Sequence, residues 1–164
     1  MTKQREPQGC LAPILKLFGI SPTDTRGVSA PQFPYHCKDY LFTKGERAFF
    51  DVLCAAVGND YLIFSKVRLA DLIFVRRGTE KRQAYFNRIQ SKHVDFVICS
   101  RDVVRPLLAI ELDDASHERE DRQERDGFVD SALAAAKLPI LHIKARASYD
   151  ARSLRAAIDG RLKR

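Results

Sequence analysis

Two apolar runs joined by a short polar segment decide the fold of this chain. The first is HVDFVICS at residues 93–100, and the second is PLLAIELDD at residues 106–114. Each run has the length and apolar content of a buried strand. The residues between them, around Arg101 and Asp102, are polar and few. The stretch therefore predicts a β-hairpin.

Periodic apolar residues surround this hairpin on both sides. Helical spacing predicts helices over 43–57, 116–137 and 150–162. Strand-like runs occupy 61–65, 67–69 and 139–143, whereas 70–75 fits either a strand or a short helix. The basic stretch 76–92 predicts a loop with a turn or two of helix. The order helix, three strands, helix, strand, helix predicts an α/β domain without internal repeats.

The amino-terminal part of the chain has a different character. Residues 1–42 hold five of the seven prolines and show little periodicity, so we expect an extended arm or linker there. The folded domain is predicted to span residues 43–164. At 164 residues and 45% hydrophobic composition, the chain can bury a core without disulfide bonds.

Membrane and secretory classes fit the sequence poorly. The apolar run CLAPILKLFGI at residues 10–20 is interrupted by Pro13 and Lys16, and a bilayer span needs roughly 20 apolar residues. The same end lacks the pattern of a secretory signal. The four cysteines are scattered, without the paired spacing of a zinc site, and we expect Cys54 and Cys99 to be reduced core residues. We therefore expect a cytoplasmic protein with no membrane partner.

The net charge of +7 is unevenly distributed along the chain. Residues 76–92 and 144–164 each carry +5, whereas residues 111–126 between them carry −5. Basic segments can hold a polyanion by neutralising its phosphates, but an acidic centre repels it unless cations intervene. This arrangement suggests a metal-dependent enzyme acting on nucleic acid. Solvated helix faces would give the same charges.

Three carboxylates of the hairpin are predicted to converge. If the hairpin is symmetric about Val103, Asp95 lies opposite Glu111, with Cβ atoms about 4.5–5.5 Å apart. Asp113, two residues beyond Glu111, shares that face. Such a cluster raises the cost of ionisation unless a divalent cation is present, and Mg²⁺ prefers oxygen ligands of this kind. A slipped register, or ion pairs with the basic segments, would explain the carboxylates without a metal.

Other polar residues are candidates for supporting roles. His117 follows the second strand and is a candidate general base, phosphate contact or metal ligand, or else a polar loop residue. Glu46 fits the capping box Thr43-x-x-Glu46, and capping alone would explain it. For charge stabilisation the candidates are Lys66, Lys92 and Lys144, of which the last two are favoured by their places at strand ends.

The helix after the hairpin adds basic candidates. Arg119 or Arg122 could reach a scissile phosphate, although the spacing of Arg122 and Asp126 also fits an exposed ion pair.

Taken together, the run HVDFVIC, the run LLAIELDDASH, the charged helix with RQERD and the strand LPILHI resemble the PD-(D/E)xK phosphodiesterase superfamily. The resemblance covers about residues 43–143 and is closest to a bacterial domain family near the very-short-patch repair endonuclease-like branch. It implies a restriction-endonuclease-like core, in which a helix, a three-stranded β-meander, a helix and a strand form a mixed central sheet with helices on both faces.

The resemblance also implies roles for individual residues. Asp95 stands where the superfamily's first aspartate ligates metal, and Glu111 stands where its second acidic ligand lies. Glu46 matches an acidic residue on the first helix, and His117 matches a histidine of the repair-endonuclease-like branch. Asp126 matches a recurrent aspartate of the helix. The chain departs from the pattern at Asp113, where the lysine of (D/E)xK is expected.

The hypothesis is an endonuclease that hydrolyses phosphodiester bonds of nucleic acid, DNA rather than RNA, with Mg²⁺ or Mn²⁺ held by Asp95 and Glu111. Asp113 or His117 would orient or deprotonate the attacking water. Lys92, Arg119, Arg122 and Lys144 are the predicted nucleic-acid contacts. The alternatives are a non-catalytic nucleic-acid-binding module on the same fold and a protein-interaction domain. A homodimer is compatible with the sequence.

Overall fold

The computed structural model describes residues 33–113 and 120–163, with the side chains of residues 120–126 left out. The chain divides into two units, residues 1–39 and residues 40–164. The helices and strands of the described residues lie in the second unit, and most of the first unit lies outside the described residues. Phe42 already belongs to this fold, since its ring packs against the rings of Phe50 and Phe96.

A four-stranded sheet in the order β1-β2-β3-β4 forms the centre of the domain. Strands β1 (Leu62–Arg68), β2 (His93–Cys99) and β3 (Pro106–Asp113) are successively antiparallel. Strand β4 (Ile140–Lys144) runs parallel to β3. The parallel pairing requires a crossover, which helix α5 (Glu120–Ala135) supplies. The result is a mixed sheet in an α/β domain, as the sequence predicts.

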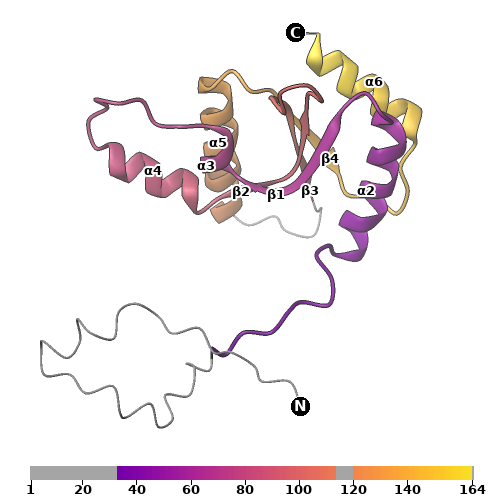
Figure 1. Ribbon diagram of the computed structural model, residues 1–164, viewed down its shortest axis with the longest axis horizontal. Coiled ribbons are helices and arrows are strands. Elements are labelled where there is room, and N and C mark those ends of the chain that lie inside the picture. Colours follow the sequence, from indigo (N-terminus) through magenta and orange to yellow (C-terminus); the bar gives the residue numbers. More distant parts are fainter. Residues whose placement is uncertain (1–32, 114–119, 164) are drawn as a thin grey trace, which may run out of the picture. The chain divides into compact units, whose positions relative to one another are not determined.

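Helices cover both faces of this sheet (Figure 1). On one face, α2 (Lys44–Val57) and α6 (Ala151–Leu162) pack on a cluster that includes Phe49, Phe96 and Ile110. On the other, α3 (Leu69–Leu72), α4 (Arg82–Gln90) and α5 pack on a cluster that includes Val97 and Leu133. Burial of apolar area on both faces is the main stabilising contribution to such a layered domain.

The hairpin has the predicted register over most of its length. Phe96 pairs with Ile110 and Ile98 with Leu108, and an irregularity follows at Cys99. Two helices lie between β1 and β2. The run 70–75, for which the sequence allows a strand or a short helix, is the short helix α3 followed by coil. Within the basic stretch 76–92, α4 extends over nine residues.

Two cysteines lie differently from one another. Cys99 is buried, as expected, but Cys54 is exposed, so the prediction of a core position for Cys54 is wrong. The buried face of α2 holds Phe49, Leu53, Ala56 and Val57, and Cys54 lies outside that stripe. Among the described residues, no helix is long and apolar enough to cross a membrane.

Candidate active site

Lys66 of the edge strand β1 lies between the carboxylates of Glu46 and Asp95. The Nζ atom of Lys66 donates a hydrogen bond to Oε1 of Glu46 on α2 and lies 3.2 Å from Oδ1 of Asp95 on β2. The carboxylate side chains are each 15% exposed, and that of Lys66 is 28% exposed. This half-buried group joins three elements that are far apart in the sequence.

Glu46 has a second role that fixes its position. Thr43 caps α2, and its side chain accepts a hydrogen bond from the backbone N–H of Glu46. In return, the backbone N–H of Thr43 donates to Oε2 of Glu46 at 2.8 Å. The predicted capping box is therefore confirmed. Because one oxygen serves the cap, the other is held toward Lys66.

An irregularity in β1 lets Lys66 reach this position. Lys66 has a φ of 55°, in the left-handed region that few residues other than glycine adopt. The regular pairing of β1 with β2 skips this residue, whereas Ser65 and Val67 on either side are paired. In an unbroken strand Ile63 and Val67, which are four residues apart, would face the same side of the sheet. Here Ile63 packs against the cluster under α2 and α6, whereas Val67 packs against the cluster under α3, α4 and α5. The alternation of side chains is therefore reversed at Lys66.

The charges of this group stabilise one another. Burial opposes the ionisation of Glu46, but hydrogen bonds from Lys66 and then from Thr43 lower the pKa of its carboxyl below the usual value. Burial likewise opposes the charge on Lys66, but its hydrogen bond to Glu46 and the field of Asp95 raise the pKa of its amine. Lys66 therefore remains an ammonium ion at neutral pH.

Asp95 also fastens β2 to β3. Its Oδ2 atom accepts a hydrogen bond from the backbone N–H of Leu112 at 3.0 Å. Continuing the register of the hairpin by one residue from the pair Phe96 and Ile110 puts Asp95 across from Glu111. Glu111 is half-buried in the middle of the sheet, because β4 lies on its other side with His142 as its partner.

Asp113 belongs to a separate hydrogen-bonded group on the α5 side. His142 Nδ1 lies 3.1 Å from Oδ1 of Asp113, and His142 Nε2 lies 3.0 Å from Oδ1 of Asp130 on α5. Burial disfavours the imidazolium form, but the hydrogen bonds to Asp113 and Asp130 raise the pKa of His142 above its usual value. Sequence reasoning named neither His142 nor Asp130; the signal available for His142 was its position as the polar residue within the apolar strand LPILHI.

The structure divides the predicted carboxylate group. Asp95 is connected through Lys66 to α2, whereas Asp113 is connected through His142 to α5. Among the residues that the structure describes, no three His, Cys, Asp or Glu side chains form a group that could hold a metal ion. The sequence predicts that Asp95, Glu111 and Asp113 share one patch; in the structure Asp95 and Asp113 have different hydrogen-bond partners, and the alternation of β2 is reversed near Asp95 as that of β1 is at Lys66. Val94 and Phe96 accordingly belong to different core clusters.

The predicted basic residues lie in several places. Lys66 contacts Asp95, although the sequence favours Lys92 and Lys144 over Lys66 as candidates for charge stabilisation. The amine of Lys92 lies 5.9 Å from the ring centroid of Phe128, and Lys144 is exposed at the end of β4, beside Asp113 in the strand register. His117 and Arg119 lie outside the described residues. Arg122 and Asp126 are on α5, in the part whose side chains the structure does not describe.

The fold is that of an α/β protein in which Asp95 and Glu111 lie on the adjacent central strands β2 and β3 and Lys66 lies on the edge strand β1. Residues 38–162 match the family described as "Protein of unknown function (DUF2726)". Because the match covers most of the chain, the protein belongs to this family. No curated protein matches the chain, and no solved structure matches it.

Proposed function

We propose that this protein is a Mg²⁺-dependent nuclease that hydrolyses phosphodiester bonds of nucleic acid, DNA rather than RNA, on a restriction-endonuclease-like core. The observation that carries the proposal is the position of Asp95, which is hydrogen-bonded to β3 next to Glu111 and also contacts Lys66. Two acidic residues on adjacent strands with a lysine beside them are the residue types that this chemistry needs. The order of helix, antiparallel strands, helix and parallel strand supports the same assignment.

The residues that would hold the metal are Asp95 and Glu111. Mg²⁺ is commonly bound through one or two carboxylates together with waters and phosphate oxygens, and both side chains offer carboxylate oxygens from neighbouring strands. Bound there, the ion would lower the pKa of a water and offset negative charge on the phosphate. Mn²⁺ prefers similar ligands and is the natural substitute.

Lys66 is the residue that we propose in place of the lysine expected at position 113. Its ammonium group lies 3.2 Å from Asp95, so a phosphate drawn to this edge of the sheet meets a positive charge there. Charges fixed in advance stabilise a developing negative charge without reorganisation in the transition state. Glu46 would act as a positioning residue, because its carboxylate is fixed by the cap of α2 and holds Lys66 in turn.

Asp113 and His117 remain the proposed residues that orient or deprotonate the attacking water. The hydrogen bond that Asp113 accepts from the His142 ring supports a role for Asp113, since a general base is effective when a neighbour fixes its orientation. Lys92, Arg119, Arg122 and Lys144 are proposed to contact the phosphate backbone, which gives affinity without sequence information.

The test is metal-dependent cleavage by purified protein. Supercoiled plasmid and circular single-stranded DNA are incubated with Mg²⁺, with Mn²⁺ or with EDTA, and the products are separated on a gel. We expect nicking or linearisation with either metal, no cleavage in EDTA, and a loss of at least about 100-fold in rate for Glu111→Gln and Lys66→Met. The matched control is Asp51→Asn, an exposed carboxylate on α2 that pairs with Arg47.

Binding separates the two candidate functions. If Glu111→Gln abolishes cleavage but leaves the affinity for DNA unchanged, the nuclease assignment stands. If the wild-type protein binds DNA with a steep salt dependence but never cleaves it with Mg²⁺ or Mn²⁺, the assignment fails in favour of the non-catalytic module. The observation that favours this second candidate is Asp113, which stands where the PD-(D/E)xK pattern has a lysine.

A further inference from the structure

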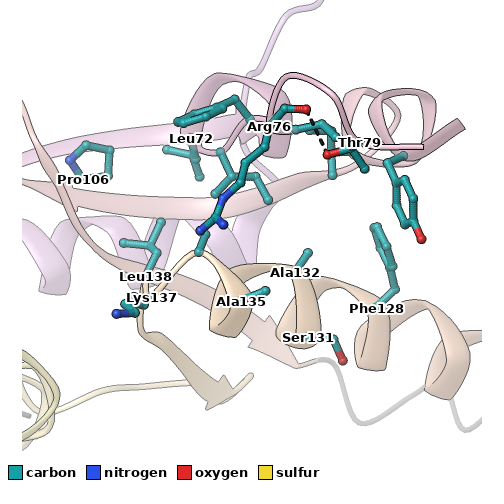
Figure 2. A pocket seen from close by; sticks show the side chains of 16 residues that line it. Leu72, Arg76, Thr79, Pro106, Phe128, Ser131, Ala132, Ala135, Lys137 and Leu138 are labelled. Atoms are coloured by element: carbon teal, nitrogen blue, oxygen red, sulfur yellow. Dashed lines mark hydrogen bonds between the residues drawn. The ribbon is translucent and has the colours of Figure 1, made fainter. Parts of the chain in front are cut away.

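A groove of about 1000 Å³ lies on the α5 side of the domain, away from Lys66 in the sequence and on different elements. It is lined by the segment that follows α3, by α4 and by α5 (Figure 2). The side chains along α5 are small, namely Ser131, Ala132 and Ala135, and Phe128 stands at one end. Sites for small organic molecules enclose about 300–1,000 Å³, so the groove has room for an unstacked base.

Two aromatic side chains of this groove are left exposed. Phe74, on the segment after α3, is 85% exposed, and Tyr85, on α4, is 50% exposed. Phe128 is different, because the guanidinium of Arg88 covers its ring at 4.0 Å from the centroid. An exposed phenylalanine ring does not gain the stabilisation that burial of apolar area gives to core residues. A ligand that stacks on the Phe74 ring would bury this apolar area.

The groove and its rim are basic. Arg76 and Lys137 are the charged residues among its described lining, which includes no carboxylate. The segment 76–92, which includes Arg76 and helix α4, carries six cations and one carboxylate, Glu80. Among the side chains that the structure describes, none of those six cations forms an ion pair; in contrast, Arg47, Arg68 and Arg155 elsewhere all do. Cations without a carboxylate partner next to exposed rings match a ligand that carries both phosphates and aromatic faces.

We infer that this groove binds single-stranded nucleic acid, with unpaired bases stacking on Phe74 and Tyr85 and the phosphates held by the cations of residues 76–92. Base stacking on aromatic side chains together with a basic track along the backbone is the general means of holding a single strand. A duplex offers phosphates but keeps its bases stacked on one another, so it would use the cations and not the rings. The substrate class is thereby narrowed to nucleic acid with an unpaired segment.

The inference deepens the proposed function and rests on it. Helix α5 connects the two regions, because Asp130 of this helix bonds to His142 while Phe128 and Ser131 line the groove. A strand held in the groove would therefore lie against the same helix that supports the group containing Asp113. The inference concerns where the substrate binds, and the proposed function concerns where it is cut.

The test measures binding of the full chain to a fluorescein-labelled oligothymidylate and to a duplex of equal length by fluorescence anisotropy in EDTA, so that no cleavage occurs. We expect Phe74→Ala and Tyr85→Ala each to weaken single-strand binding by about 5- to 150-fold, the range for losing one stacked base, while duplex binding changes by less than about twofold. The matched control is Tyr40→Ala, an 82% exposed aromatic residue outside the groove. Circular dichroism confirms that each variant is folded.

A double variant tests whether the cations of residues 76–92 hold the phosphates. Arg76→Gln combined with Lys81→Gln is expected to weaken both ligands and to reduce the slope of log Kd against log salt by about two. An unchanged slope would contradict the placement of the phosphates.

Failure of the inference is distinguishable from failure of the proposed function. If the protein cleaves DNA with Mg²⁺ but both ring variants bind and cleave the single strand like the wild type, the groove inference is overturned and the nuclease stands. If cleavage is never seen but both ring variants lose single-strand affinity, the groove inference stands without the nuclease. If the ring variants instead turn a dimer into a monomer in sedimentation experiments and leave oligonucleotide binding intact, the groove is a self-association surface and the inference is wrong.

Discussion

Replacing Lys66 by methionine tests whether its charge holds the Glu46 and Asp95 carboxylates together. Methionine keeps the length and the apolar stem of the side chain but removes the ammonium group. The variant leaves two carboxylates, each only 15% exposed, without their common cation. Losing one partner costs about 3–5 kcal/mol for a fully buried pair and close to zero for an exposed one, so a half-buried group should lose about 1–2 kcal/mol at neutral pH.

Urea denaturation at two pH values measures this effect and identifies its origin. With a slope of about 1–2 kcal/mol per molar urea, the midpoint should fall by about 1 M at pH 7. The pKa of Glu46 is lowered in the folded protein, so the stability that it contributes is present above its unfolded-state pKa and is lost as the pH falls through the folded value. Because Glu46 becomes neutral in acid, the difference between wild type and Lys66→Met should shrink on going from pH 7 toward pH 3.

The control is Lys163→Met, which removes an exposed lysine at the end of α6 and should shift the midpoint little at either pH. A loss of stability in Lys66→Met that is the same at both pH values would refute the electrostatic reasoning, since packing of the stem does not depend on protonation. A variant as stable as the wild type at pH 7 would refute the pairing itself.

Two further predictions concern the core and the α5 side. Phe96→Ala should lower the free energy of unfolding by about 3–5 kcal/mol, because the ring is fully buried and packs against Phe42, Phe49 and Phe50. Thermal unfolding measures this loss, and the control Phe96→Leu should retain most of the stability. The pKa of His142 should exceed that of a free imidazole, so its contribution to stability is fully present below about pH 6.5 and is lost as the pH rises through the folded value. An NMR titration of the His142 ring gives the pKa directly, and Asp130→Asn should move it downward; no movement would show that the 3.0 Å contact carries no charge interaction.

The local elements of this domain could be predicted from the sequence because short-range patterns determine them. The capping box of Thr43 and Glu46 involves residues three apart, and the structure has it as predicted. The hairpin register follows from the short polar turn between two apolar runs, and the pairs Phe96 with Ile110 and Val97 with Ala109 agree with it. Periodicity therefore places the carboxylates of Asp95 and Glu111 on adjacent strands.

The tertiary structure alone decided which side chains meet. Lys66, rather than Lys92 or Lys144, reaches Asp95 because the backbone of β1 adopts a φ of 55° there, and this reverses the alternation on which the sequence argument depends. Asp113 lies next to His142, which in turn bonds to Asp130, because α5 crosses over the sheet and β4 pairs parallel to β3. Sequence patterns report which face a residue takes in an unbroken element, but contacts between distant elements depend on the packing that the whole chain adopts. The sequence thus determined the strands and their carboxylates, and the packing of the chain determined their partners.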